Sequence, residues 1–296
     1  MISPLTLPSP VHRLDRLSEQ WQVDLWAKRD DLIPQFLGGN KVRKTLGILE
    51  ALGELPDVLI TNGGSESNHA RVVALMGGQL GCEVHLVLHG EPGSQRGNGF
   101  FCAEAGASLH YVRPEDIAEK IADLNKNQLA QGKKVAIIPG GGHAPEGAIA
   151  YAEAVKELPF DPDYIVHASG TGGTQAGLVL GVEEHGLKAT VIGVSVARAA
   201  GRGRQEIERL LPDDLHPAVH FDDRFRFGGY EKSKPELLGF VSDVLRNEGL
   251  PIDPTYTGKA MYGLVKMIET GEIQKGSRIV FWHTGGLMNL LSAKIS

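Results

Sequence analysis

Two lysines that follow a pair of glycines are the first residues in this chain that could do chemistry. The segment FLGGNKVRKTLG, residues 36–47, places Lys41 and Lys44 three positions apart where a helix is expected to begin. A permanent ammonium is unfavourable at a helix N-terminus, whereas an amine there can condense with an aldehyde. Lys44 shares the same helical face and could neutralise an anion beside the same ligand. The plain alternative for Lys41 is a solvated surface lysine.

A glycine-rich turn further along the chain has the composition of an anion cradle. The segment HASGTGGTQAGL, residues 167–178, leads from a predicted strand into a predicted helix and contains Thr171 and Thr174. The first turn of such a helix offers unpaired backbone N–H groups to an anion. The segment lacks the Gly-Lys-Ser/Thr of a nucleotide-binding P-loop, and Gln175 stands where a dinucleotide motif needs its last glycine. A tight structural turn is the alternative.

A third turn combines a hydroxyl and an amide at a helix start. The segment GGSESNHAR, residues 63–71, places Ser67 and Asn68 before an apolar run. These groups, together with the backbone N–H groups of a helix N-terminus, suit a carboxylate. A helix cap with no ligand is the alternative.

The surrounding pattern predicts how these turns are positioned. Short β-branched runs at residues 57–61, 83–88, 134–139, 164–169, 190–196 and 278–282 predict strands. Amphipathic stretches at residues 68–81, 113–132, 145–158 and 234–249 predict helices. This alternation is typical of an α/β fold with parallel sheets and crossover helices. Since ligands bind at the carboxyl ends of such strands, we expect the glycine turns to converge on one ligand.

The composition excludes several classes of protein. The 296 residues are 42% hydrophobic and 22% charged, values of a folded globular chain with two lobes or one large α/β unit. A net charge of −6 with no basic stripe argues against nucleic acid as a partner. No apolar segment has the ~18 residues needed to span a bilayer, so no membrane partner is expected. The N-terminal segment does not resemble a signal peptide, which predicts a cytoplasmic location.

Neither the cysteines nor the histidines form a recognisable site. Two cysteines, Cys82 and Cys102, are too few for a disulfide framework in a chain of this length. Four histidines lie near the predicted turns without the spacing of metal ligands, so no metal is expected. They are His69, His143, His167 and His283.

Five segments together resemble the pyridoxal-phosphate enzymes of the D-cysteine desulfhydrase and 1-aminocyclopropane-1-carboxylate deaminase family. They are KRDDLIPQFLGGNKVRK, GGSESNHARVVA, SGTGGTQAGL, DPTYTGKAMYGL and HTGG, and they run from residue 28 to residue 286. The resemblance implies the tryptophan-synthase-β-like fold (fold type II): two open, twisted, mostly parallel sheets flanked by helices, with pyridoxal 5′-phosphate between two domains. It also implies a small domain at residues 45–151 and a large cofactor-binding domain at residues 1–44 and 152–296.

The resemblance also implies roles for individual residues. The expected cofactor-binding residues are Lys41, Lys44, Asn68, Thr171, Gly172, Gly173, Thr174, Tyr256, Thr257 and Thr284. Lys41 would bind the cofactor covalently and move the α-proton of the substrate. Asn68 would hydrogen-bond the phenolic oxygen of the cofactor, and Lys44 would hold its phosphate together with residues 171–174.

The catalytic residues implied by the resemblance are Lys41, Ser67, Tyr230 and Tyr256. Ser67 would lie beside the substrate carboxylate, and Tyr256 against the pyridine ring. Tyr230, in FGGYEKSK, is similar to a second active-site tyrosine of the family.

Position 257 indicates which reaction to expect. The cyclopropane deaminases carry Tyr-Glu-Gly where this chain has Tyr256, Thr257 and Gly258. A neutral hydroxyl does not hold a proton on the pyridine nitrogen as a carboxylate does. A less electron-withdrawing ring favours α,β-elimination over opening of a cyclopropane ring. Elimination from a small amino acid gives a keto acid, ammonia and the β-leaving group. With D-cysteine the products would be pyruvate, ammonia and sulfide.

Other activities remain open at this point. They are 1-aminocyclopropane-1-carboxylate deamination, another amino-acid deamination, β-replacement or racemisation on the same cofactor, and ligand binding without catalysis. Glu66 replaces the glutamine that the family generally has before the serine. An acid here predicts a shifted substrate unless it points away, pairs with a cation or meets a cationic group. A homodimer is expected from the family.

Overall fold

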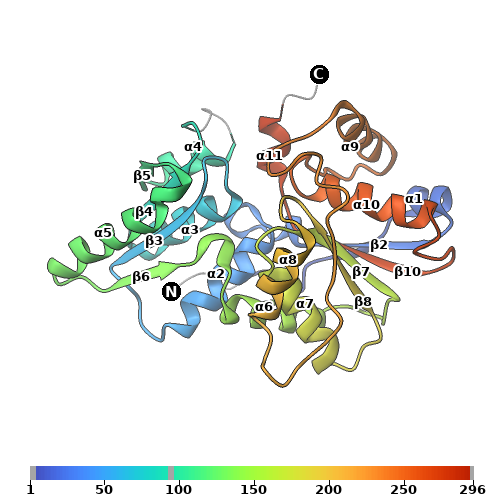
Figure 1. The fold of residues 1–296 in the computed structure, drawn as a ribbon, viewed down its shortest axis with the longest axis horizontal. Coiled ribbons are helices and arrows are strands. Elements are labelled where there is room, and N and C mark those ends of the chain that lie inside the picture. Colours follow the sequence, from blue (N-terminus) through green and yellow to red (C-terminus); the bar gives the residue numbers. More distant parts are fainter. Residues whose placement is uncertain (1–4, 93–96, 294–296) are drawn as a thin grey trace.

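The computed structural model describes residues 5–92 and 97–293. Its strands form two sheets that lie side by side, each flanked by helices (Figure 1). The six strands predicted from the sequence are all present, and the expected α/β architecture with two mostly parallel sheets is confirmed.

The larger sheet has the strand order β1-β2-β10-β7-β8-β9. Its strands are β1 (Val11–Arg13), β2 (Asp24–Arg29), β7 (Tyr164–Ser169), β8 (Thr190–Ser195), β9 (His220–Asp222) and β10 (Arg278–His283). Only β1 is antiparallel to its neighbour; the other pairs are parallel.

Both faces of this sheet are buried. Successive side chains of a strand point to opposite sides, so each strand contributes to two cores. On β10, Ile279 and Phe281 join one core, and Val280 and Trp282 join the other. The first core is covered by α1 (Asp15–Trp21), α9 (Pro235–Glu248) and α10 (Thr257–Glu269). The second is covered by α6 (Pro145–Val155), α7 (Gly173–Glu184) and α8 (Ala200–Glu208).

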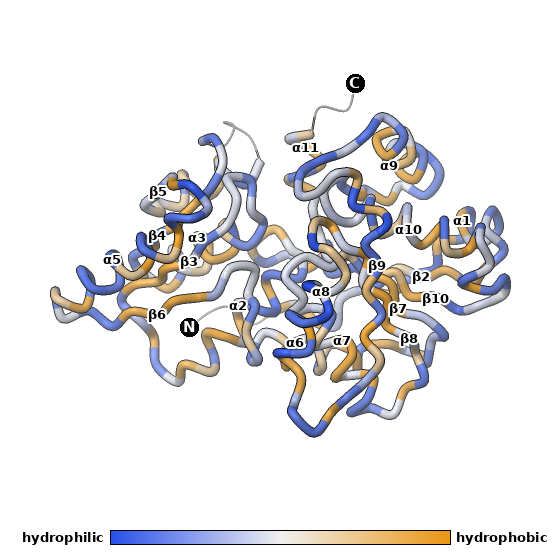
Figure 2. The backbone as a smooth tube through the Cα atoms, in the orientation of Figure 1, coloured by the Kyte–Doolittle hydropathy of each residue, from blue (hydrophilic) through white to orange (hydrophobic). Residues whose placement is uncertain are grey.

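The smaller sheet has the strand order β5-β4-β3-β6, with all pairs parallel. Its strands are β3 (Val58–Gly64), β4 (Glu83–His89), β5 (Ser108–Tyr111) and β6 (Val135–Ile138). The helices α2 (Asn40–Ala51), α3 (Asn68–Leu80) and α4 (Asn98–Glu104) pack with one core, and α5 (Ile117–Ala130) packs with the other. In Figure 2 the strands β3, β6, β7 and β8 are largely orange, the colour of hydrophobic residues, and many of the connecting loops are blue.

The remaining elements are short. They are the 3₁₀ turns η1 (Asp30–Leu32), η2 (Gln35–Leu37), η3 (Pro114–Asp116) and η4 (Gly140–Gly142), and the helix α11 (Leu287–Ser292). The predicted domain limits, after residue 44 and after residue 151, fall inside α2 and α6. That division stays a prediction.

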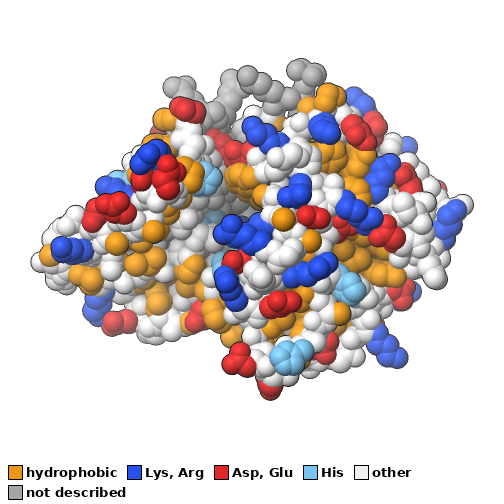
Figure 3. All heavy atoms as spheres, in the orientation of Figure 1, with side chains coloured by type: hydrophobic (Ala, Val, Ile, Leu, Met, Phe, Trp, Pro, Cys, Tyr) orange, Lys and Arg blue, Asp and Glu red, His pale blue; other side chains and the backbone are white. Residues whose placement is uncertain are grey.

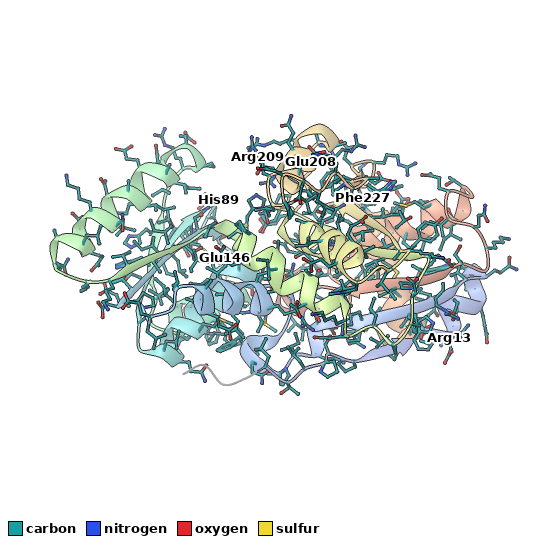
Figure 4. The ribbon with its side chains drawn as sticks, turned by 90° about the horizontal axis from the view of Figure 1, so that it is seen from below. Arg13, His89, Glu146, Glu208, Arg209 and Phe227 are labelled. Atoms are coloured by element: carbon teal, nitrogen blue, oxygen red, sulfur yellow. The ribbon has the colours of Figure 1, made fainter. Side chains whose placement is uncertain are left out.

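Helix α6 lies between α2 and α7 and packs against both (Figure 4). It thereby connects the two sheets. A Cβ at Gly177 would stand 2.2 Å from the carbonyl oxygen of Ala148, and one at Gly181 would stand 2.6 Å from that of Ala152. Only glycine at these positions allows the backbones of α6 and α7 to approach so closely. The helices that carry the lysines and the glycine turn are therefore held in a fixed relation.

A buried ionic network anchors α2 to the larger sheet. Arg43, only 4% exposed, pairs with the carboxylates of Asp30 at 2.9 Å and Glu157 at 2.7 Å. Asp30 also accepts hydrogen bonds from Tyr151 at 2.6 Å and Trp282 at 2.8 Å. Burial alone would raise the pKa of Asp30, but the charge of Arg43 and these donors hold it below its ordinary value. Arg43 thus has a structural role beside the two lysines.

The surface shown in Figure 3 mixes Lys and Arg with Asp and Glu, without a stripe of either sign. Among the described residues, no helix has the length and apolar character required to cross a membrane. No group of three or more His, Cys, Asp or Glu side chains in residues 5–92 and 97–293 could hold a metal ion.

Candidate active site

The glycine pair before α2 fits against the end of β10. Gly39 has a φ of 94°, and a Cβ there would lie 2.8 Å from the carbonyl oxygen of Thr284. The Asn40 N–H donates to the same carbonyl at 3.0 Å, and the Gly39 N–H donates to the carbonyl of Asp30 at 2.8 Å. These contacts place the first turn of α2, with Lys41, beside the HTGG segment.

The two lysines share a single neutral partner. Nζ of Lys41 lies 3.3 Å and Nζ of Lys44 lies 2.6 Å from the carbonyl oxygen of Gly141. Burial lowers the pKa of Lys41 to about 8. Burial and the charge of Lys41 lower the pKa of Lys44 well below its ordinary value. Two amines around one carbonyl favour an added anion. With a pKa of about 8, about one tenth of Lys41 is neutral at pH 7, far more than for an ordinary lysine.

The turn after β7 presents donors to the same place. Gly172 has a φ of 101° and precedes α7, and a Cβ on Gly173 would lie 3.5 Å from Nζ of Lys44. The buried hydroxyls of Ser169 and Thr171 have no hydrogen-bond partner in the described part of the chain. Unsatisfied hydroxyls at a helix N-terminus beside a lysine are the partners that a phosphate group requires. These residues therefore fit the phosphate of the expected cofactor.

Ser67 and Asn68 begin α3. The hydroxyl oxygen of Ser67 accepts from the N–H groups of His69 and Ala70, both at 3.2 Å, so Ser67 caps the helix. Accepting these bonds leaves the hydroxyl hydrogen available to a ligand. The cap and a carboxylate contact are thus compatible.

The two tyrosines form a pair. The hydroxyls of Tyr230 and Tyr256 lie 2.6 Å apart, and their rings are 5.9 Å apart at an angle of 70°. Burial raises the pKa of both, so both are neutral at physiological pH. The ammonium of Lys259 donates to the carbonyls of Arg226 at 2.9 Å and Gly229 at 2.6 Å, which holds the segment before Tyr230.

Thr257 is fully buried and bonded to Asp253. Its hydroxyl donates to Oδ1 of Asp253 at 2.8 Å and accepts from the Asp253 N–H at 2.9 Å. Oδ2 of the same carboxylate accepts from the N–H groups of Thr255 and Tyr256, both at 2.9 Å. Asp253 therefore fixes the turn that presents Tyr256.

A cavity between the glycine turns collects most of the predicted residues. Those that line it are Lys41, Lys44, Asn68, Thr171, Gly172, Thr174, Tyr256 and Thr284. Four others are not part of its lining, although each neighbours or contacts a residue that is: Ser67, Gly173, Tyr230 and Thr257. The three glycine turns thus converge, although they are far apart in the sequence.

Six further residues line the cavity without having been singled out from the sequence. They are Asn40, Ala168, Ser169, Gly170, Gly285 and Gly286. All belong to the quoted glycine-rich segments, so the signal was present in the motifs themselves. Asn40, for example, donates from Nδ2 to the hydroxyl of Thr174 at 3.0 Å.

Glu66 directs its carboxylate toward α4. Oε2 accepts from the N–H groups of Asn98 at 2.8 Å and Gly99 at 3.4 Å. A carboxylate at a helix N-terminus is stabilised by the unpaired N–H groups there. Of the arrangements considered for Glu66, the structure thus favours the one in which it points to another element.

Two of the histidines near the turns lie within hydrogen-bond distance of neighbouring protein groups. Nε2 of His69 lies 2.9 Å from the hydroxyl of Thr61, and Nε2 of His283 lies 3.1 Å from the carbonyl of Pro251. Burial lowers the pKa of His143 and of His167 to about 4, so both are neutral.

Comparison with known proteins gives consistent matches along nearly the whole chain. The family model described as "Pyridoxal-phosphate dependent enzyme" matches residues 2–285. The bifunctional D-cysteine desulfhydrase/1-aminocyclopropane-1-carboxylate deaminase of Arabidopsis thaliana, a mitochondrial protein, is 35% identical over 96% of this chain and 77% of its own length. The D-cysteine desulfhydrase of Serratia proteamaculans is 31% identical over 94% of this chain and 91% of its own. A crystal structure of an ACC deaminase homologue superposes with a TM-score of 0.87 at 31% identity, covering 97% of this chain and 92% of that one.

Proposed function

The chain belongs to the pyridoxal-phosphate-dependent enzymes, within the family of D-cysteine desulfhydrases and 1-aminocyclopropane-1-carboxylate deaminases, and we propose that it catalyses α,β-elimination on a small amino acid. Its products are a keto acid, ammonia and the β-leaving group. The observation that carries this proposal is the cavity in which Lys41 and Lys44 face the glycine turn at residues 170–174.

The residues of the cavity divide between the two ends of the cofactor. When bound, pyridoxal phosphate supplies an aldehyde that condenses with amines and a ring that withdraws electrons from the substrate's α-carbon. Lys44, the hydroxyls of Thr171 and Thr174, and the N–H groups at the start of α7 hold the phosphate. Support for this comes from the unpartnered hydroxyl of Thr171 and the proximity of Lys44 to Gly173.

Lys41 holds the cofactor covalently and carries the α-proton of the substrate. Its lowered pKa supports this role, because a proton carrier works best when its pKa lies near the working pH. Ser67 would offer its free hydroxyl hydrogen to the substrate carboxylate. Tyr256 would lie against the ring of the cofactor, supported by its hydrogen bond to Tyr230.

Elimination is favoured over ring opening by the residue at position 257. Thr257 contributes a neutral hydroxyl whose hydrogen is already bonded to Asp253. A neutral acceptor stabilises a protonated ring nitrogen less than a carboxylate would. The weaker electron withdrawal suffices to expel a good leaving group such as thiolate.

Product analysis tests the proposed activity. The purified enzyme is incubated with D-cysteine, L-cysteine, β-chloro-D-alanine, D-serine and 1-aminocyclopropane-1-carboxylate, and keto acid, ammonia and sulfide are measured. From D-cysteine and water we expect pyruvate, sulfide and ammonia in equal amounts. Release of neither keto acid nor ammonia from any of the β-substituted amino acids would refute elimination.

A second candidate is the deamination of 1-aminocyclopropane-1-carboxylate to 2-oxobutyrate and ammonia. It is favoured by the Arabidopsis relative, whose name carries both activities. In the same assay, 2-oxobutyrate without keto acid from D-cysteine would support this candidate alone.

The pH dependence of cofactor incorporation tests the environment of Lys41. Only the neutral amine condenses with an aldehyde, and the pKa of Lys41 is lowered to about 8. We therefore expect the rate of incorporation into apo-protein to rise about ten-fold from pH 7 to pH 9 and then level off. An ordinary lysine, with a pKa near 10.4, would give a rise of about 100-fold with no levelling. Stopped-flow absorbance measures the rate, and the second profile would contradict the assignment.

Replacing Ser67 with alanine separates its two roles. Loss of the cap is expected to lower the free energy of unfolding by about 1 kcal/mol, measured by urea denaturation. Loss of the hydroxyl is expected to raise the KM for the amino acid about ten-fold with a smaller change in kcat. An unchanged KM accompanied by the stability loss would reduce Ser67 to a helix cap.

A homodimer and a cytoplasmic location complete the proposal. The homodimer is inferred from the family resemblance, and the cytoplasmic location carries over the expectation from the sequence. Sedimentation velocity tests the first, with a single species of twice the chain mass as the expected result.

A further inference from the structure

Behind Asn68, a cluster of side-chain amides and one buried arginine joins three helices. We call it the amide cluster; it consists of Asn68 and Arg71 on α3, Asn98 on α4, Asn289 on α11 and the backbone carbonyl of Glu66. Arg71, Asn98 and Asn289 are 2%, 0% and 5% exposed. Of these five residues only Asn68 lines the cavity.

Arg71 determines which end of two amides faces it. Its Nη1 lies 3.1 Å from Oδ1 of Asn68 and 3.0 Å from Oδ1 of Asn98. A guanidinium has only hydrogens to offer, so the amide atom facing it must be an oxygen. The oxygen of Asn68 is thereby directed into the cluster.

The carbonyl of Glu66 fixes the other end. It accepts from Nδ2 of Asn98 at 3.0 Å and from Nδ2 of Asn289 at 3.1 Å. A carbonyl can only accept, so the nitrogen of Asn289 faces it, and the oxygen of Asn289 faces Nδ2 of Asn68 at 2.6 Å. Arg71 can only donate and the Glu66 carbonyl can only accept, so together they determine the orientation of every amide in the cluster.

This polarity leaves one donor for the cavity. Nδ2 of Asn68 has two hydrogens, one of which is bonded to Asn289. Resting on the cofactor site proposed above, we propose that Arg71 and Asn289 are positioning residues that fix Asn68 so that its second N–H donates to the phenolic oxygen of pyridoxal phosphate. Neither residue touches the cavity, so both act through Asn68.

The charge of Arg71 matches this role. Its three partners are neutral oxygens, the third being the carbonyl of Gly38 at 3.0 Å from Nη2. Burial lowers its pKa to about 10, so it remains charged at neutral pH. The guanidinium of Arg71 is buried and bonds to the side-chain oxygen of Asn68. Its positive charge therefore polarises the Asn68 N–H toward an anionic acceptor. A deprotonated ring oxygen and the carboxylate of the substrate are the two acceptors of this kind, and the ring oxygen is the one proposed.

An analogue without the ring oxygen distinguishes these acceptors. Dissociation constants of pyridoxal 5′-phosphate and 3-deoxypyridoxal 5′-phosphate are measured for the apo-forms of the wild type, Asn68→Ala, Arg71→Met and Asn289→Ala. The ratio of the two constants is the readout, because a general loss of folding or of phosphate binding affects both ligands alike. We expect the wild type to prefer the complete cofactor about ten-fold or more, as for a hydrogen bond to a charged group, and each of the three variants to bring the ratio toward one.

Two results would overturn the proposal. A ratio near one in the wild type would mean that the amide does not meet the ring oxygen. A ratio lost in Asn68→Ala but kept in Arg71→Met and Asn289→Ala would mean that the pair does not position it. Ser292→Ala, on the same helix as Asn289, is the matched control and should keep the wild-type ratio, since within the described residues its hydroxyl bonds to carbonyls of α11.

Arg71 holds the oxygen of the Asn68 amide and Asn289 holds its nitrogen, so the two variants disturb opposite ends of the same group. Asn289→Ala leaves the buried charge and the contact to Gly38 intact, so it applies even where Arg71→Met is too unstable to purify. The binding measurement involves no turnover. Failure of keto-acid release in the wild type would therefore refute the proposed function without altering these ratios.

Discussion

Replacing Lys41 with alanine is expected to lower the turnover of the enzyme at least about 10³-fold, since this residue supplies both the covalent link and the proton transfer. The phosphate cradle of Lys44 and residues 171–174 is unchanged in the variant, so pyridoxal phosphate should still bind, but reversibly. Steady-state release of keto acid measures the loss, and dialysis of the loaded protein measures the reversibility.

Lys156 provides the matched control for this variant. It lies at the end of α6, its side chain is 54% exposed, and it forms an ion pair with Glu153 one turn away. Lys156→Ala should therefore keep wild-type turnover. A Lys41→Ala variant that retained more than about one tenth of wild-type turnover would contradict the assigned role, because general acid–base catalysis alone contributes about 10²-fold or more.

Replacing Asp30 with asparagine is expected to cost about 3–5 kcal/mol in the free energy of unfolding, the usual consequence of breaking a buried ion pair. Both oxygens of Asp30 accept from donors: Oδ1 from Arg43, and Oδ2 from Tyr151 and Trp282. An amide would turn a donor toward one of these pairs and leave Arg43 without that charge. Because the Gly39 N–H also bonds to the carbonyl of residue 30, the loop that leads to Lys41 should loosen as well.

Urea unfolding followed by circular dichroism measures this loss. The pKa of Asp30 in the folded chain is below its ordinary value, so its contribution is present above about pH 4 and disappears as the pH falls through the folded-state pKa. Asp243→Asn is the control, since Asp243 is 66% exposed and pairs with Arg246 at the surface. It should change stability by less than about 0.5 kcal/mol. A loss of the same small size in Asp30→Asn would show that the buried network does not anchor α2.

The sequence pattern predicts the strands that are rich in apolar residues and misses the strands that are short or carry several charged residues. The six predicted strands are short runs rich in apolar, mostly β-branched residues, the composition that parallel strands of an α/β fold favour. The missed β2 reads DLWAKR, and its last two residues are charged but buried. Lys28 is tolerated there because Glu157, 129 residues away, accepts its hydrogen bond. No local pattern reveals a partner at that distance. The short β1, β5 and β9 lie at or near the edges of the sheets and carry too few residues for a periodic signal.

The candidate site likewise contains residues that a local sequence pattern reveals and residues that it does not. Lys41, Lys44 and the turn at residues 171–174 are recognisable because five segments together resemble one family, although each segment alone also has a plain structural explanation. Their convergence follows from the rule that parallel strands present their carboxyl ends to one edge. The supporting residues are not recognisable in this way. Asn289 reaches Asn68 across 221 positions, and Arg43 reaches Glu157 across 114. Long-range partners of ordinary polar residues become visible only in the folded chain.

The most direct test of the account is to reduce the cofactor-loaded enzyme with borohydride and map the modified residue by mass spectrometry of its peptides. We expect one phosphopyridoxyl group per chain, carried by Lys41. A group on Lys44, Lys259 or any other lysine, or a reduced protein that carries none, would contradict it.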